Sequence, residues 1–153
     1  MVNLISITEE NFLEAAKLRV REDQQGFLAP PMGILARAYV YRDDNAKVYG
    51  ISLDGALIGL AMVRELKEEP VCYELQQFMV DKRFQNQGWG TAALEQLLAM
   101  LAGERKYPAV EVCVDRNAGQ ALRVYQKLGF RDTGYLDPSV PNSLNLRYSF
   151  RGE

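Results

Sequence analysis

Histidine is absent from this chain of 153 residues. Its absence excludes Ser-His and Cys-His nucleophilic schemes, histidine general bases and most transition-metal sites. Acid–base chemistry must therefore use Glu, Asp, Tyr, Lys, Cys or water. Cysteine is also scarce, and Cys72 and Cys113 both fall in expected strands, where a free thiol behaves as a small apolar side chain. We expect neither a structural disulfide nor a metal site.

Long apolar runs and an excess of basic charge are missing as well. No stretch approaches the roughly 20 apolar residues of a membrane span. The N-terminal segment carries the acidic residues Glu9 and Glu10, which are not typical of a signal peptide. The net charge of −2 at pH 7 disfavours a nucleic-acid partner. An apolar fraction of 48% and a charged fraction of 25% are typical of a soluble globular protein. We expect one domain over residues 1–153, located in the cytoplasm.

The most informative segment runs from Phe78 to Thr91. A short apolar run predicts a buried strand, a polar turn follows, and Gly88-Trp89-Gly90 begins a helix that we expect to reach about Ala102. Glycines at such a junction let a ligand approach the backbone closely. The first N–H groups of a helix have no intrahelical hydrogen-bond partner, and they form the positive end of the helix dipole. This segment therefore predicts an anion site, most naturally for the phosphates of a cofactor.

Two nucleotide-binding patterns compete for this segment. A P-loop is excluded, because no Gly-Lys-Ser or Gly-Lys-Thr occurs in the chain. Gly88 to Ala93 fits the dinucleotide pattern G-x-G-x-x-G/A, with Asp115 as a candidate ribose-binding acid after the next strand. However, 38 residues after Asp115 are too few for the remaining strands and helices of that fold. A lone match of this kind is weak evidence, so we disfavour the dinucleotide fold without excluding it.

The order of elements is predicted from periodicity and turn signals. Asp54-Gly55 between two apolar runs indicates a hairpin of strands 48–53 and 56–63. Thr8 is the expected N-cap of a helix that ends near Arg21, and Pro30, Pro31 and Gly33 indicate a loop. The resulting order is β-α-α-β-β-β-α-β-α-β-β, and it includes a first strand 2–7, helices 34–41, 90–102 and 118–128, and strands 109–114, 130–136 and 144–150.

That order, the glycine turn and a second segment resemble the GNAT superfamily of N-acetyltransferases over essentially the whole chain. Gln85, Gly88 and Gly90 match the family's [RQ]-x-x-G-x-[GA] motif, and Tyr125 to Phe130 match its Y-x-[KR]-x-G-F signature. The resemblance implies a single α/β sandwich with a mixed, mostly antiparallel sheet. It further implies a split between the fourth and fifth strands, which holds acetyl-CoA, and helices on both faces.

The resemblance also assigns the cofactor-binding residues. The backbone of Phe78, Met79 and Val80 would pair with the pantetheine arm, and Tyr125 would place its hydroxyl near the thioester sulfur. Asn117 is expected near the cofactor, although it stands one position before the place where many members keep an asparagine. The amides that would take the pyrophosphate belong to Gln85, Asn86, Gln87, Gly88, Trp89, Gly90 and Thr91.

Transfer of an acetyl group to an amine needs a base, an oxyanion donor and an acid for the departing thiolate. A backbone N–H near Met79 would serve the oxyanion, and the Tyr125 hydroxyl would protonate the thiolate. In polyamine acetyltransferases of this superfamily an acid often occupies the position of Gln76, which cannot take a proton. Glu74 lies two residues earlier, on the same strand face by alternation. Glu74 is therefore a candidate base that acts through a water chain, or it simply attracts a cation. Glu22 and Asp23, at the end of the first helix, are the other candidate bases.

The segment after the first helix narrows the resemblance to bacterial spermine/spermidine, or diamine, acetyltransferases. Val20, Gln24, Phe27 and Leu28 match the pattern Val-x-x-x-Gln-x-x-Phe-[VL] of that group. Glu22, Phe27, Tyr39, Glu74 and Gln76 are the expected amine-binding residues, because carboxylates and aromatic faces suit a polycation.

Alternatives from other classes remain open. The acceptor could be a protein N-terminus, an aminoglycoside or an amino acid, or the chain could be a CoA-binding module with little catalysis. A homodimer is expected by analogy with the superfamily.

Overall fold

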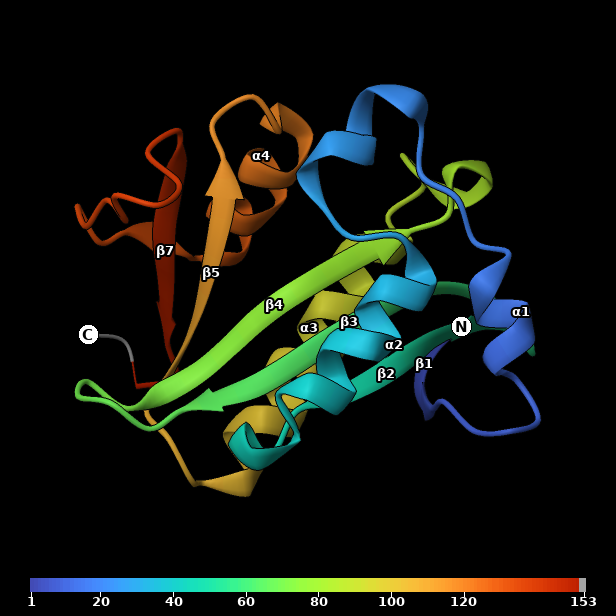
Figure 1. Ribbon diagram of the computed structural model, residues 1–153, viewed down its shortest axis with the longest axis horizontal. Helices are drawn as coiled ribbons and strands as arrows, with labels where there is room; N and C mark the ends of the chain where they lie inside the picture. Colours follow the sequence, from blue (N-terminus) through green and yellow to red (C-terminus); the bar gives the residue numbers. More distant parts are fainter. Residues whose placement is uncertain (152–153) are drawn as a thin grey trace.

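The computed structural model describes residues 1–151, and these form one seven-stranded sheet with helices on both faces (Figure 1). The strand order is β1-β2-β3-β4-β5-β7-β6. Every neighbouring pair is antiparallel except β4 and β5, which are parallel. The expected mixed, mostly antiparallel α/β fold is therefore confirmed. The strands are β1 Val2–Ser6, β2 Lys47–Leu53, β3 Ala56–Leu66, β4 Cys72–Val80, β5 Ala109–Asp115, β6 Arg131–Asp132 and β7 Ser143–Ser149.

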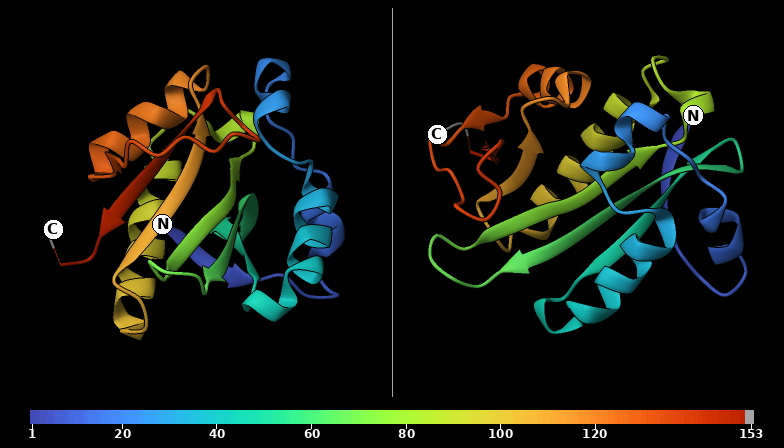
Figure 2. Two further views of the ribbon diagram at one scale, coloured as in Figure 1. Left: turned by 60° about the vertical axis from the view of Figure 1, so that its left-hand side comes forward. Right: turned by 45° about the horizontal axis from the view of Figure 1, so that its top comes forward.

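The helices divide between the two faces of the sheet. Helices α1 (Phe12–Ala16) and α2 (Pro31–Val40) cover one face, and α3 (Trp89–Glu104) and α4 (Gly119–Leu128) cover the other. Figure 2 shows the sheet between these two layers. Three short 3₁₀ turns lie in the connecting segments: η1 (Glu22–Phe27) between α1 and α2, η2 (Arg42–Asp44) between α2 and β2, and η3 (Lys82–Phe84) between β4 and α3.

Each face has its own apolar core. Leu94, Leu97 and Leu101 of α3 pack with Tyr125 of α4 against buried side chains of β4 and β5. On the opposite face, Leu18 and Ile34 pack against Met62 of β3 and Met79 of β4. Because successive strand residues face opposite sides, β4 contributes to both cores. The central strand is therefore held firmly from both sides, and it forms one wall of the cavity described below.

The hairpin prediction is confirmed. Asp54 and Gly55 join β2 to β3, and both have positive φ, 49° and 90°. A two-residue turn with positive φ at both positions matches the right-handed twist of the flanking strands. Asp-Gly supplies that geometry at little cost, since asparagine and aspartate tolerate it and glycine prefers it.

The predicted boundaries of the first helix are wrong. Helix α1 has five residues, its N-cap is Asn11 rather than Thr8, and the chain leaves the helix before Arg19. The amide of Arg19 donates instead to the carboxylate of Asp81 at 2.9 Å, and the Lys82 amide donates to the Arg19 carbonyl at 2.7 Å. A long-range contact thus replaces the last helical turn.

The proline pair has the opposite role from the one predicted. Pro30 is the N-cap of α2 and Pro31 is its first residue, so the two prolines start the helix instead of interrupting the chain. At the C-terminal end, the strand expected over 130–136 is reduced to the two residues of β6, whereas β7 agrees with the expected strand 144–150. Among residues 1–151, no helix is long and apolar enough to cross a membrane.

Candidate functional site

The candidate site lies where β4 and β5 part. The two strands are paired at only two positions, Tyr73 with Val110 and Glu74 with Glu111. Beyond the pairing of Glu74 with Glu111 the two strands diverge, as Figure 1 shows. The β5-facing edge of β4 after Glu74 therefore has no strand partner in the described ladder. Main-chain groups on such an edge are positioned to pair with an extended ligand as an added strand would.

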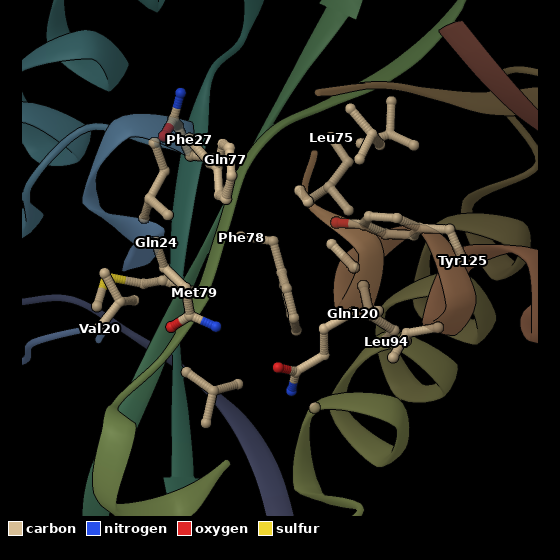
Figure 3. A pocket seen from close by; sticks show the side chains of 18 of the residues that line it. Val20, Gln24, Phe27, Leu75, Gln77, Phe78, Met79, Leu94, Gln120 and Tyr125 are labelled. Atoms are coloured by element: carbon tan, nitrogen blue, oxygen red, sulfur yellow. The ribbon is translucent and has the colours of Figure 1, made fainter. Parts of the chain in front are cut away.

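A cavity of about 270 Å³ fills the space between the diverging strands. Figure 3 shows Phe78 in its middle, Gln24 and Phe27 entering from η1, and Tyr125 and Gln120 entering from α4. The cavity continues to the glycine turn before α3 and to the first turn of that helix, where Asn86, Gly88, Gly90 and Thr91 line it. One cavity thus joins the point where the strands part to the start of a helix.

The turn before α3 has the backbone conformation of an anion site. Asn86 has φ 61° and Gly88, the N-cap of α3, has φ 87°. Gly90 packs closely on the sheet, since a Cβ there would lie 3.4 Å from Cγ2 of Val80. Helix α3 is 16 residues long, and its first amides have no intrahelical partner. These amides and the helix dipole favour a phosphate group at the cavity end.

The side chain of Gln85 ties this turn to η1. Gln85 and Gln24 exchange two amide hydrogen bonds of 2.9 and 3.1 Å, and Gln85 Nε2 also donates to the Val80 carbonyl at 2.9 Å. Arg21 donates to Gln85 Oε1 at 3.0 Å. Gln120 of α4 donates to Asn86 Oδ1 at 3.0 Å. The rim of the cavity is therefore a connected set of amides from η1, the turn and α4.

Tyr125 carries the hydroxyl that the sequence assigned to acid catalysis. Its ring is 5% exposed and packs edge-on against Phe130, with the ring centroids 5.2 Å apart. In Figure 3 the hydroxyl points from α4 into the cavity, toward Leu75. Burial raises the pKa of Tyr125 above its ordinary value near 10. The hydroxyl therefore keeps its proton through the neutral range, as a proton donor must.

Glu74 is placed differently from the prediction. It is not among the residues that line the cavity, and its Oε1 accepts a hydrogen bond of 2.8 Å from Arg64 of β3. Arg64 also lies 4.2 Å from the ring centroid of Tyr41. Glu74 belongs to a row of charged residues in register across β3, β4, β5 and β7: Arg64, Glu74, Glu111 and Arg147. Arg147 pairs with Glu111 at 3.0 Å, so an arginine neutralises each carboxylate.

A β-bulge explains why alternation misplaced Glu74 relative to Gln76. Met62 of β3 pairs with Gln77, whereas the next residue, Val63, pairs with Leu75. Gln76 is therefore an extra residue in β4, and the period-two rule does not carry across it. Gln76 lines the cavity and Glu74 does not.

The structure divides the other predicted residues into two groups. Glu22 and Asn117 are exposed, and Tyr39 is 68% exposed with its ring under Arg42. The Asn117 amide donates to Asp115, and the N-cap of α4 is Ala118, which lines the cavity. Gln87 bonds to the Arg83 carbonyl. The predicted residues that do line the cavity are Phe27, Gln76, Phe78, Met79, Val80, Gln85, Asn86, Gly88, Gly90, Thr91 and Tyr125, whereas Glu22, Tyr39, Glu74, Gln87, Trp89 and Asn117 do not.

Several lining residues were not predicted as site residues. Gln77, Cys113 and Gln120 line the cavity, but nothing in their local sequence distinguishes them. Asp115 also lines it, and the sequence had indicated this residue only as a ribose-binding acid of the disfavoured dinucleotide fold. Gln24 had a signal, the Val-x-x-x-Gln-x-x-Phe pattern, and all four residues matched to that pattern line the cavity. Burial raises the pKa of the Cys113 thiol, so this cysteine carries its proton at neutral pH. Within residues 1–151, no group of three or more Cys, Asp or Glu is placed to hold a metal ion.

Comparisons with known proteins agree with this geometry. A family model described as the acetyltransferase (GNAT) family matches residues 8–130. The spermine/spermidine N(1)-acetyltransferase of Bacillus subtilis (strain 168) is 27% identical over 144 residues, which are 89% of this chain and 91% of that protein.

Two solved structures share the fold of this chain. The spermidine N-acetyltransferase from Vibrio cholerae, in complex with CoA and spermine, has a TM-score of 0.78 at 13% identity, and the match covers 99% of this chain and 96% of that one. The aminoglycoside acetyltransferase AAC(6′)-Ib, in complex with coenzyme A, has a TM-score of 0.81 at 17% identity with the same coverage.

Proposed function

Because the chain belongs to the acetyltransferase (GNAT) family, we propose that it transfers an acetyl group from acetyl-CoA to a primary amine of a small, polyamine-like molecule. The family and its N-acetyltransferase relatives establish an acetyl-CoA-dependent N-acetyltransferase. The proposal concerns the amine and the residues that act on it. The observation that supports it is one cavity that joins an unpaired strand edge, a helix N-terminus and a buried phenol.

The residues present fit acetyl-CoA at the parted strands. The free edge of β4 beyond Glu74 would pair with the extended arm, and Phe78 and Met79 line that side of the cavity. The amides of the positive-φ turn and of the first α3 residues would hold the pyrophosphate. Gln85 would act through its side chain, which anchors the turn to η1. When bound, acetyl-CoA supplies the activated acetyl group.

Tyr125 is the proposed acid. The amine nitrogen would attack the thioester carbonyl directly, in a complex that holds both substrates. A main-chain N–H on the unpaired edge near Met79 would stabilise the negative charge that develops on the carbonyl oxygen. The departing sulfur needs a proton, and the buried hydroxyl of Tyr125 points into the cavity to supply it.

The acceptor side would be formed by η1 and the bulge of β4. Phe27, Leu28 and Gln76 line the cavity there, and the relative from Bacillus subtilis is a spermine/spermidine acetyltransferase. Glu74 lies beside the cavity in its ion pair with Arg64. Because Arg64 neutralises its carboxylate and Glu74 does not line the cavity, we assign Glu74 no part in the reaction.

The proposal is tested by thiol release from acetyl-CoA with a panel of amines. The panel holds spermidine, spermine, putrescine, an aminoglycoside, free amino acids and a short peptide, which represent the alternative acceptors. Turnover of one polyamine at least tenfold above the others supports the polyamine class. If no amine is turned over while CoA still raises the melting temperature, the chain is a CoA-binding module and the proposal is wrong. The expected homodimer is a separate prediction, which light scattering in solution tests.

A further inference from the structure

Gln76 carries a buried side-chain oxygen that no group of the described residues uses. Within residues 1–151, its Oε1 is a buried side-chain atom for which no hydrogen-bond partner is found. Gln76 is the extra residue of the β4 bulge, and it lines the cavity two residues beyond the last paired position of β4 and β5. An unpaired buried acceptor costs about 1–3 kcal/mol, and folded proteins contain few of them. Such a group at a cavity wall indicates a ligand that donates an N–H or O–H.

Unlike Gln76, the neighbouring glutamines use their side-chain oxygens in hydrogen bonds within the protein. Gln77 Oε1 accepts the Ala29 amide at 2.9 Å, and Gln24 Oε1 accepts from the Arg21 amide and from Gln85. These two side chains hold η1 against β4 and the turn. Gln76 therefore has a free acceptor where its neighbours have structural roles. The terminal torsion of a glutamine is broad, so a rotation of the amide plane turns the oxygen toward a ligand at little cost.

The charges around this acceptor are few. From β4, Glu74 is paired with Arg64 of β3, and from β5, Glu111 is paired with Arg147 of β7. The residues of η1 and the preceding segment that line the cavity are uncharged. The titratable residues that line it are Cys113 and Asp115 from β5 and Tyr125 from α4.

Among the described residues that line the cavity, Asp115 is the carboxylate, and it lies further along β5 than Gln76 lies along β4. It lies four residues beyond the paired Glu111, roughly 13 Å along β5, against roughly 7 Å for Gln76 along β4. Its Oδ1 accepts the Asn117 amide at 2.8 Å and the Asn142 side chain at 3.2 Å. The acceptor end of the cavity is therefore neutral. An ammonium placed there would lose its hydration without gaining a counter-ion, which costs several kcal/mol.

We propose that the acceptor nitrogen enters this cavity as an uncharged amine and donates one N–H to Gln76 Oε1. This inference rests on the proposed function and specifies the form of its substrate. The nitrogen lone pair forms the C–N bond, and the C–S bond breaks. The uncharged amine has two N–H groups and the product amide keeps one. After Tyr125 has given its proton to sulfur, its phenolate takes the proton lost from nitrogen, so the reaction balances with no further general base. The favoured acceptors are primary amines of lowered pKa.

Binding calorimetry of the complex with CoA tests the inference. At pH 8, an alkylamine with a pKa of about 10.4 should release close to one proton per molecule bound, measured in two buffers of different ionisation enthalpy. Gln76→Glu should abolish the release, because a carboxylate there holds the ammonium form. Gln126→Glu, an exposed position on α4, adds the same charge elsewhere and should leave the release unchanged. Gln76→Leu should weaken amine binding at least tenfold and leave CoA binding unchanged.

The pH dependence of kcat/KM is the second readout. For the native chain, the pH at which kcat/KM levels off should follow the acceptor, near 8 for an α-amine and above 10 for an alkylamine. If kcat/KM levels off at the same pH for both acceptors, or if the amine binds without proton release, the inference is overturned and the proposed function stays intact. CoA binding with no amine bound or turned over would overturn the proposed function, and this inference with it.

Discussion

The substitution Tyr125→Phe separates catalysis from folding at this site. The ring of Tyr125 is 5% exposed and packs on Phe130 with the centroids 5.2 Å apart, and phenylalanine preserves that contact. No side-chain hydrogen bond of the hydroxyl is found among residues 1–151. The substitution thus removes one oxygen that faces the cavity and no hydrogen bond between described residues.

The expected magnitudes follow from this geometry. The free energy of unfolding should change by less than about 0.5 kcal/mol, as for substitutions that break no contact. Loss of a general acid lowers kcat by roughly 10²- to 10⁴-fold, which corresponds to about 3–5.5 kcal/mol in the activation free energy. The dissociation constant of CoA should stay within about twofold, since the hydroxyl is not assigned to phosphate or pantetheine binding.

The assay measures kcat with the best amine, the CoA dissociation constant and the melting temperature for the same preparation. Tyr135→Phe is the control, because Tyr135 is 61% exposed and does not line the cavity. Since burial holds the pKa of Tyr125 above 10, native kcat should show no loss from phenol ionisation up to pH 10. An unchanged kcat in Tyr125→Phe would refute the assignment of Tyr125 as the acid.

Two further predictions concern the framework of the site. Burial raises the pKa of Asp81, but hydrogen bonds from the Arg83 side chain and from the Arg83 and Arg19 amides outweigh it and lower the pKa below its usual range. Asp81→Asn should therefore cost about 2–4 kcal/mol in urea unfolding at pH 7. That difference should persist above the unfolded pKa near 4 and fall as the pH drops through the folded pKa; a pH-independent loss would contradict the account. Gly59→Ala should destabilise by at least about 1–3 kcal/mol and weaken CoA binding, because its Cβ would collide with the Met79 carbonyl beside the cavity. Gly103→Ala, where a Cβ meets nothing within 4 Å, is its matched control in both measurements.

Local chemistry made much of the fold predictable. Asp54-Gly55 specified a hairpin because few residue pairs accept positive φ at both positions. Gly88 predicted the turn before α3 because glycine readily adopts the positive φ that this left-handed N-cap has. These features depend on the residues themselves and on neighbours within a few positions, so they can be read along the chain.

Other elements depended on contacts between distant segments. Leu18 and Val20 have the spacing of a helix face, yet Asp81, 62 residues away from Arg19, draws the chain out of the helix. Pro30 and Pro31 are compatible with a break or with a helix start, and packing of Ile34 into the core decides for the start. Tyr39 was plausible as a pocket wall on sequence grounds, but its side of α2 faces away from the cavity.

By itself, the sequence excluded histidine chemistry and predicted a mixed α/β sheet with a glycine turn before a long helix, and its motifs resembled the family that the family model confirms. The turn and the excluded chemistry follow from residue type and spacing, which act over a few positions. Only the tertiary structure decided which groups share the cavity. The bulge at Gln76 breaks the alternation on which Glu74 was chosen, and Arg64 on a neighbouring strand neutralises that carboxylate. Register and partnership between strands are set by the packing of the whole sheet, so a single strand's sequence cannot specify them.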